Sequence, residues 1–266
     1  MMVPIAVSIA GSDSGGGAGI QGDLKTFSAL GVYGASVITA LTAQNTKRVA
    51  AIHDVPADFV VAQIDAVFSD LDVGAVKIGM LSQAAAIAAV AEGLDRWRQR
   101  SVVLDPVMVA SSGVRLLAPD AFDALKRLLM PRALVITPNL PEAALLLDAP
   151  LARDESEMRM QAEQLITLGA KAVLIKGGHG EGTEAVDLLV EPASVTRLVG
   201  PRIAGVDLHG TGCALSSAIA AFLAKGLHLV DATRAAKAYV TAAIAAGERV
   251  KVGHGRGPVH HFHEWW

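Results

Sequence analysis

Short apolar runs alternate with segments of helical periodicity along most of the chain. The apolar runs that predict strands span residues 5–10, 37–41, 75–78, 102–104, 133–136 and 172–175. Apolar spacing of three and four residues predicts helices over 20–30, 60–68, 84–98, 122–129, 142–147, 155–168, 213–225 and 232–249. Residues 186–190 and 195–199 are expected to form a hairpin or an edge pair.

The nearly continuous apolar character of the strands indicates that both of their faces are buried. A mostly parallel sheet with helices on either side satisfies this requirement, so we expect an α/β fold with a doubly wound sheet. No Pro/Ser-rich linker, composition break or internal repeat is found, which favours a single domain over residues 1–266. Ligands bind such sheets beyond the carboxyl ends of the strands, so residues just after each strand are the first candidates for chemistry.

The composition excludes several classes of protein. Lys and Arg number 23 against 26 Asp and Glu, a net charge of −3, so no basic excess is available to neutralise a nucleic-acid backbone. Hydrophobic residues make up 52% and charged residues 18%, the reverse of what a disordered chain needs. The longest uncharged run, residues 26–46, contains polar side chains such as Gln44 and Asn45 and does not predict a membrane span.

Two features bear on location. The first residues, Met1 to Pro4, show neither a basic segment nor a cleavage site, so we expect no signal peptide. Cys213 is the only cysteine, which excludes an internal disulfide and is typical of a reducing compartment. Both features favour the cytoplasm.

A glycine-rich loop follows the first predicted strand. Residues 17–22 fit the pattern G-x-G-x-x-G, which on its own suggests a dinucleotide-binding turn. That turn needs an acidic residue about twenty positions later, and none occurs between Leu24 and His53. A Walker A loop fails as well, because Asp23 stands where its lysine must be. Glycines beside Asp13 and Asp23 still allow a close backbone approach, which favours a ligand-facing loop.

A second glycine site, Gly210, Thr211, Gly212 and Cys213, stands at the start of a predicted helix. Free backbone N–H groups at a helix start bind anions, aided by the positive end of the helix dipole, so this segment is a candidate cradle for a phosphoryl group in transfer. A helix start also tends to lower the pKa of a thiol, which makes Cys213 a candidate reactive residue. The alternative is a buried cysteine that acts as a small hydrophobe.

Three further strand ends carry charged side chains. Asp105 and Glu142 each follow a predicted strand, and two carboxylates are a reasonable outer shell for Mg²⁺, which keeps several waters. Taken singly, Asp105 fits a turn before Pro106, and Glu142 fits a helix start. Lys176 precedes flexible backbone at Gly177 and suits a phosphate contact.

Together these motifs resemble those of the ribokinase-like superfamily, which combines an early glycine-rich loop, an N-x-x-E segment and a late G-x-G anion hole. Most members carry Asp as the base where this chain has Cys213, and the cysteine variant resembles the vitamin-kinase branch. Within that branch the chain resembles bacterial hydroxymethylpyrimidine/phosphomethylpyrimidine kinases over nearly its full length. The matching segments are residues 15–21, 23–26, 37–41, 43–46, 77–81, 137–143, 176–179, 252–255 and 257–263.

The resemblance implies two ATP-dependent phosphorylations in thiamin synthesis. The first converts 4-amino-5-hydroxymethyl-2-methylpyrimidine to its monophosphate, and the second converts the monophosphate to the diphosphate. It implies ATP and Mg²⁺ as cofactors and small molecules as substrates, with no nucleic acid and no membrane. A homodimer is compatible with this interpretation.

The resemblance also implies roles for individual residues. It places Gln44 at the pyrimidine, where an amide can both donate and accept hydrogen bonds. The other substrate-binding positions are Met80 and Val107, in apolar contact with the ring, and Asp23, Gly11 and Ala18. The nucleotide positions are Asn139, Lys176 and Lys237, the metal positions are Asp105 and Glu142, and the catalytic positions are Gly210, Thr211, Gly212 and Cys213.

Four positions depart from the family pattern: Ser14, Ser111, Val114 and Leu208. Ser111 and Val114 fall in a segment expected over the phosphates, and they do not touch the anion hole. Two alternatives stay open. One is a pyridoxal or pyridoxine kinase of the same superfamily, since the rings are similar in size. The other is a non-catalytic vitamin or nucleotide sensor, which should have lost the anion hole or the metal carboxylates that this chain keeps.

Overall fold

A computed structural model gives the structure of the chain, and it describes residues 3–108, 117–178, 183–203 and 208–266. Its central strands are β1 (Ile5–Ala10), β2 (Tyr33–Ile38), β5 (Ala75–Ile78), β6 (Val102–Leu104), β7 (Val135–Ile136), β8 (Val173–Lys176), β9 (Glu184–Glu191) and β10 (Ser194–Pro201). They form one eight-stranded sheet in the order β10-β9-β8-β7-β6-β5-β1-β2. All neighbours are parallel except β8 with β9 and β9 with β10, so the predicted mostly parallel sheet and terminal hairpin are confirmed.

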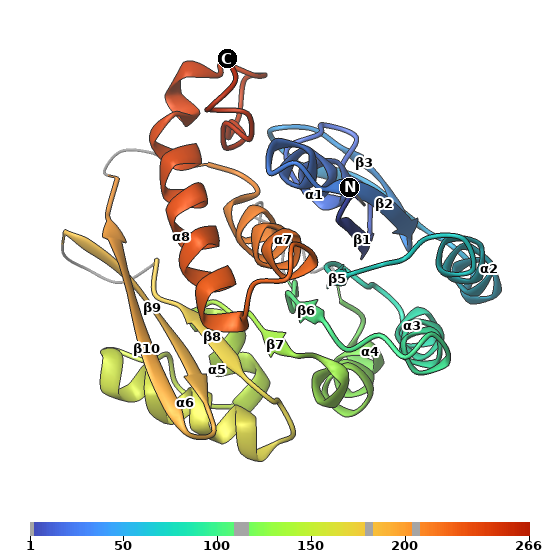
Figure 1. The fold of residues 1–266 in the computed structure, drawn as a ribbon, viewed down its shortest axis with the longest axis horizontal. Helices are drawn as coiled ribbons and strands as arrows, with labels where there is room; N and C mark the ends of the chain where they lie inside the picture. The colour runs from blue at the N-terminus through green and yellow to red at the C-terminus, as the bar shows by residue number, and fades with distance from the viewer. Residues whose placement is uncertain (1–2, 109–116, 179–182, 204–207) are drawn as a thin grey trace.

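Helices cover both faces of the sheet (Figure 1). One face carries α1 (Gly19–Ala29), α7 (Thr211–Ala224) and α8 (Leu229–Ala245). The other carries α2 (Ala57–Phe68), α3 (Ala84–Arg96), α4 (Pro119–Ala124), α5 (Leu140–Leu147) and α6 (Glu155–Thr167). This arrangement confirms the doubly wound α/β fold. Across the described ranges, no helix combines the length and the apolar character that crossing a bilayer requires.

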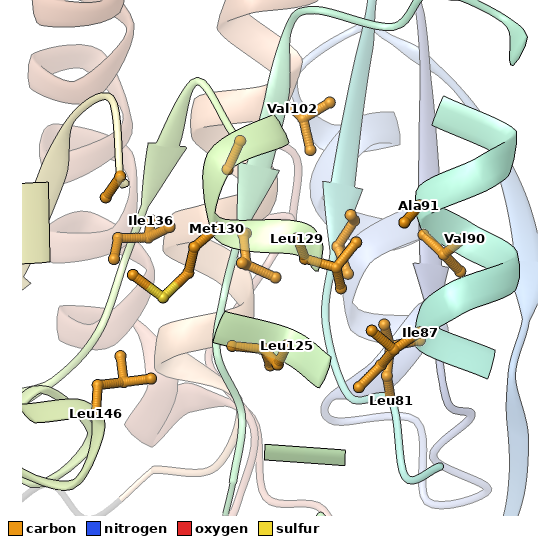
Figure 2. Packing of buried hydrophobic residues seen from close by; sticks show 14 of the residues in the cluster. Leu81, Ile87, Val90, Ala91, Val102, Leu125, Leu129, Met130, Ile136 and Leu146 are labelled. Atoms are coloured by element: carbon orange, nitrogen blue, oxygen red, sulfur yellow. The ribbon is translucent and has the colours of Figure 1, made fainter. Parts of the chain in front are cut away.

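The two faces are packed with different side chains. Figure 2 shows the first, which is packed with large apolar side chains. Ile87 comes from α3, Leu129 from the helical turn after α4, Leu146 from α5, and Val102 and Ile136 from the sheet, and all five are at most 1% exposed. Burial of each such side chain contributes about 1.5–3 kcal/mol.

The second face is rich in alanine, and α7 is buried without interruption from Ala214 to Ala221. Small side chains let α7 lie close to the sheet. Because packing holds this helix along its length, it also fixes the position of the helix start.

The predicted strand over residues 37–41 is wrong, because the chain leaves the sheet at Thr39. The N–H of Thr39 donates to Ala10 O and its hydroxyl donates to Met80 O, both at 3.1 Å, which ends β2. The chain then forms β3 (Ala40–Gln44), which pairs antiparallel with β4 (Val49–Asp54) in a separate two-stranded sheet. The partly exposed strand β4 was not predicted from the sequence. The β3–β4 hairpin is what carries Gln44 to the carboxyl ends of the main strands.

Candidate active site

A cavity of about 560 Å³ lies beyond the carboxyl ends of β1, β5, β6, β7 and β8. The structure brings together at this cavity all of the predicted site residues except Asp23 and Lys237. Those that line it are Gly11, Ala18, Gln44, Met80, Asp105, Val107, Asn139, Glu142, Lys176, Gly210, Thr211, Gly212 and Cys213. They come from segments far apart in the sequence, which meet because parallel strands end at the same edge.

Asp23, predicted to bind substrate, lies behind the cavity wall instead. Both of its carboxylate oxygens accept from the ammonium group of Lys77, at 2.9 and 2.8 Å, and neither side chain has any solvent exposure. Ser8 and Ser217 donate to the same carboxylate. These partners hold the oxygens of Asp23 away from the cavity, whereas Lys77 itself lines the cavity.

Two glycines at the start of α7 let other backbone and side-chain groups come close to the first turn of the helix. Gly210 caps the helix with a left-handed backbone, φ +83°, which glycine adopts without strain. A Cβ at this position would collide with the carbonyl oxygen of Gly17, and one on Gly212 would lie 3.1 Å from Nζ of Lys176. The first N–H groups of the helix have no partner within it. An anion at this helix start would therefore meet backbone donors and the Lys176 ammonium together.

Lys176 links the two predicted metal carboxylates. Its Nζ donates to Oδ1 of Asp105 at 2.9 Å and lies 3.9 Å from Oε2 of Glu142. Thr137 and Ser216 also donate to Asp105, at 3.2 and 3.3 Å. Five side chains thus converge on one charged cluster, and they come from β8, α5, α7 and the segments just after β6 and β7.

Asn139 and Glu142 hold the start of α5 in a reciprocal cap. The N–H of Glu142 donates to the Asn139 side chain, and the N–H of Asn139 donates to Oε2 of Glu142, both at 2.8 Å. The helix-start role that sequence reasoning kept as an alternative for Glu142 is therefore present. It coexists with the carboxylate's place at the cavity, because Oε2 also faces Lys176.

The charges of this cluster favour a cation. Burial raises the pKa of Glu142 to about 7; Lys176 opposes the rise and Asp105 adds to it. Burial alone would raise the pKa of Asp105 as well, but Lys176 and Lys77 hold it below its usual value. When Glu142 is ionised, the two carboxylates outnumber the Lys176 ammonium, and a divalent ion would favour that ionised state. The donor set therefore fits a metal that keeps most of its water. Within the described part of the chain, no three His, Cys, Asp or Glu side chains gather into a closed metal site.

Cys213 does not have the lowered pKa that its helix-start position predicts. Burial raises the pKa of the thiol to about 11, and Asp105 and Asp23 add to the rise. Lys77 and Lys176 pull in the opposite direction without overcoming it. The expectation is corrected for a physical reason: the surrounding protein removes water from the thiol, and two carboxylates face it.

The other end of the cavity is apolar. Met80 and Ala40 form a small buried cluster, against which Val107 packs. A Cβ on Gly11 would lie 3.2 Å from Sδ of Met80, so glycine leaves this wall open. β3 brings the Gln44 amide to this end, next to His209 and Asp13, so the lining combines a hydrophobic surface with a row of polar side chains.

Lys237 lines a neighbouring cavity of about 530 Å³. The two cavities share Asn139, Lys176, Thr211 and Gly212, so they meet at the start of α7. Nζ of Lys237 forms an ion pair with Asp187 at 2.6 Å. An elongated molecule can therefore reach the helix start from the second cavity while a smaller one occupies the first.

Sequence reasoning assigned no role to three residues that the structure places at the first cavity: Asp13, Lys77 and His209. A signal existed for Lys77, because a lysine inside an otherwise apolar strand requires a buried anion. Ser111, Val114 and His179, which entered the sequence argument, lie outside the described residues.

Comparisons with known proteins agree with this geometry. A family model described as phosphomethylpyrimidine kinase matches residues 13–260. The chain is 63% identical over 265 residues to a hydroxymethylpyrimidine/phosphomethylpyrimidine kinase of Rhizobium meliloti, covering 100% of this chain and 99% of the relative.

Two solved structures share the fold. A Bacillus subtilis pyridoxal kinase in complex with ADP has a TM-score of 0.90 and 36% identity, covering 98% of each chain. A Clostridium difficile phosphomethylpyrimidine kinase has a TM-score of 0.80 and 44% identity, covering 91% of this chain and 100% of that one. The match to the family model spans every strand end that lines the cavity except that of β1, and the resemblance seen in the sequence is confirmed: the chain belongs to the phosphomethylpyrimidine kinase family.

Proposed function

We propose that this protein transfers the γ-phosphoryl group of ATP to 4-amino-5-hydroxymethyl-2-methylpyrimidine, and then phosphorylates the monophosphate to the diphosphate, in thiamin biosynthesis. The observation that carries the proposal is the lining of one cavity, which has Met80 and Val107 beside the Gln44 amide at one end and the polar start of α7 at the other. A planar aminopyrimidine fits the first end, and the second stabilises a phosphoryl group in transfer.

Each part of the site then has a chemical task. Gln44 binds the pyrimidine edge, while Met80 and Val107 contact the ring faces. The N–H groups at the start of α7 and the Lys176 ammonium stabilise the equatorial oxygens of the phosphoryl group in flight. The nucleotide occupies the neighbouring cavity, next to Asn139 and Lys237.

Cys213 lies where the alcohol must approach the phosphoryl group, since it adjoins Gly212 at the helix start. We assign it the role of accepting the alcohol proton. Its raised pKa means that the thiolate is scarce at neutral pH and strongly basic when it forms. Phosphoryl transfer needs little nucleophilic push, so positioning by the helix start and Lys176 supplies much of the remaining acceleration.

Asp105 and Glu142 would hold Mg²⁺, directly or through water. The fit rests on the buried carboxylate pair with one ammonium and on the raised pKa of Glu142, which a bound cation would reverse. When bound, the ion neutralises charge that develops on the nucleotide phosphates.

Release of ADP, coupled to an indicator reaction, tests the proposal. The wild-type protein is assayed in parallel with hydroxymethylpyrimidine, its monophosphate and pyridoxal. We expect turnover of both pyrimidines, with kcat/KM for each above that for pyridoxal. A preference for pyridoxal would assign the chain to the alternative activity, which the high TM-score to a pyridoxal kinase keeps in view. Binding of ATP and pyrimidine without ADP release would instead support the sensor.

We also propose that the chain is a single domain, resides in the cytoplasm and forms a homodimer. One sheet from β1 to β10 supports the first point, and the lone Cys213 supports the second. Large exposed hydrophobic side chains near the β2 edge, Tyr33, Leu41 and Phe59, support the third. Sedimentation equilibrium at several protein concentrations tests the dimer, and a single species of 27.5 kDa would exclude it.

A further inference from the structure

Three side chains form a row beside the apolar end of the cavity. Nε2 of His209 lies 3.1 Å from Oδ2 of Asp13 and 3.2 Å from the amide nitrogen of Gln44. All three residues line the cavity. Nε2 of His209 therefore faces a carboxylate and a carboxamide at the same time. Whether Nε2 carries a hydrogen decides the nature of both contacts.

Backbone hydrogen bonds hold the Asp13 carboxylate in place independently of His209. Its Oδ1 accepts from the N–H of Gly15 at 2.8 Å, and its Oδ2 accepts from the N–H groups of Gly17 and Ala18 at 3.0 and 2.9 Å. The side chain is 3% exposed. Burial would raise the pKa of Asp13, but the hydrogen bonds from His209 and the backbone hold it below its ordinary value. The group is thus an ionised carboxylate, which can only accept hydrogen bonds.

The state of His209 follows from this neighbour. Because Oδ2 of Asp13 cannot donate, Nε2 of His209 must carry a hydrogen, whether the ring is neutral or protonated. The ring is also packed tightly, since a Cβ on Gly17 would lie 2.9 Å from its Cδ2. His209 therefore presents a donor at a fixed place.

A donor at Nε2 determines which way the Gln44 amide faces. An amide nitrogen at that position would set two donors against each other. The oxygen and nitrogen of a side-chain amide have nearly the same shape, so hydrogen bonding decides between the two orientations. We propose that Asp13, acting through His209, fixes the Gln44 carboxamide with its oxygen toward His209 and its NH₂ group away from it, and so makes His209 a specificity-determining residue.

The proposal rests on the proposed function and concerns which pyrimidine edge is accepted. A fixed amide offers an acceptor on the His209 side and a donor on the far side. An aminopyrimidine edge, with an exocyclic N–H donor next to a ring nitrogen acceptor, complements that order. The edge of the corresponding 4-oxo ring presents the reverse order, an oxygen acceptor next to a ring N–H. Since the hydroxymethyl group must reach Cys213, the ring cannot turn over to recover the match.

The test compares two ligands in two variants. Wild-type protein, His209→Asn and the control His228→Asn are assayed with hydroxymethylpyrimidine and with its analogue in which oxygen replaces the 4-amino group. Asparagine at 209 is too short to keep the contact with Gln44. His228 is an exposed histidine at the start of α8, which tolerates asparagine. Isothermal titration of both ligands accompanies the kinetics, so the amino/oxo preference is measured even if neither ligand turns over.

We expect His209→Asn to lower the amino/oxo ratio at least tenfold, mainly through KM or Kd of the pyrimidine, with KM for ATP changed less than twofold. His228→Asn should keep the wild-type ratio. A ratio in His209→Asn within twofold of wild type overturns the proposal. Absence of turnover in the wild type would count against the proposed function and leave the binding ratio to judge the role of His209.

The wild-type protein provides a second test should His209→Asn fail to fold. Long-range ¹H–¹⁵N correlation spectra of histidine-labelled protein distinguish a hydrogen on Nε2 from one on Nδ1. The histidine whose signals move on addition of hydroxymethylpyrimidine should carry its hydrogen on Nε2. A neutral ring protonated on Nδ1 alone overturns the proposal.

Discussion

The ammonium group of Lys77 donates to both carboxylate oxygens of Asp23, and neither side chain has any solvent exposure. Lys77 lines the active-site cavity, and Asp23 lies behind it. Taking two charges out of water costs several kcal/mol each, and only their mutual contact and the hydrogen bonds around them offset that cost. Removing one partner should therefore be more damaging than removing both.

Lys77→Met is expected to lower the free energy of unfolding by about 3–5 kcal/mol, because it leaves Asp23 buried without its cation. The double variant Lys77→Met/Asp23→Leu should recover part of that loss. Urea denaturation of the three proteins measures the effect, with Lys171→Met as an exposed control expected to stay within about 0.5 kcal/mol of wild type. Equal losses in the single and double variants would mean that the pair is not what stabilises this region.

Gln44→Ala should raise KM for hydroxymethylpyrimidine roughly 5- to 150-fold, equivalent to about 1–3 kcal/mol, because the polar ring edge loses its hydrogen-bond partner in the cavity. KM for ATP should change little, since the nucleotide occupies the other cavity. Steady-state kinetics with each substrate varied in turn gives both constants. Gln164→Ala, an exposed position on α6, serves as the control. An unchanged pyrimidine KM would remove Gln44 from the binding site.

Glu142→Gln should weaken Mg²⁺ activation and abolish its dependence on pH near neutrality. With a pKa raised to about 7, Glu142 is half protonated there, so Mg²⁺ affinity of the wild type should rise as pH increases from 6 to 8. The variant has no proton to lose and should show a weaker, flat affinity. Mg²⁺ titrations at several pH values compare the two proteins, and superimposable curves would restrict Glu142 to its cap with Asn139.

Glu142 should also make the free energy of unfolding depend on pH in metal-free buffer. The pKa of Glu142 in the folded protein lies above its ordinary value of 4.5, so the folded state holds the proton more tightly than the unfolded chain. Its contribution to stability is therefore complete below pH 4.5 and is lost as pH rises through about 7. Glu142→Gln should flatten that part of the stability profile in metal-free buffer.

Cys213→Ala should lower kcat roughly 10²–10⁴-fold with modest change in either KM, as removal of a general base does. Because burial raises the pKa of the thiol to about 11, the thiolate fraction of the wild type grows with pH, and kcat should rise between pH 7 and 9. Cys213→Asp should retain measurable activity and lose that slope, since a carboxylate is ionised throughout the range. Activity of Cys213→Ala within a few-fold of wild type, with no pH slope, would leave catalysis to the helix start and Lys176.

The strands that cross the middle of the sheet could be predicted because burial on both faces makes them apolar throughout, as in β5 and β6. The break at Thr39 could not, because it depends on a hydrogen bond to Met80, a residue distant in the sequence. The rule that ligands bind beyond the carboxyl ends of parallel strands predicted that the residues after these strands lie together, and it needs no knowledge of contacts. The pairing of Asp23 with Lys77 and the raised pKa of Cys213 were missed for a shared reason: both are set by neighbours that only the folded chain brings near.

The contact between Gly210 and Gly17 sets a limit on redesign of this enzyme. A Cβ on Gly210 would collide with the backbone carbonyl of Gly17, and the left-handed backbone of Gly210 also disfavours any other residue. A Cβ on Gly17 would instead lie 2.9 Å from the ring of His209 and 3.3 Å from Pro258. Libraries that seek new substrates have freedom at Met80 and Val107, whose side chains line the apolar end of the cavity. A side chain at either glycine is instead expected to shift the loop after β1 relative to the start of α7. That shift would move the alcohol away from the phosphoryl group, whichever ring the pocket binds.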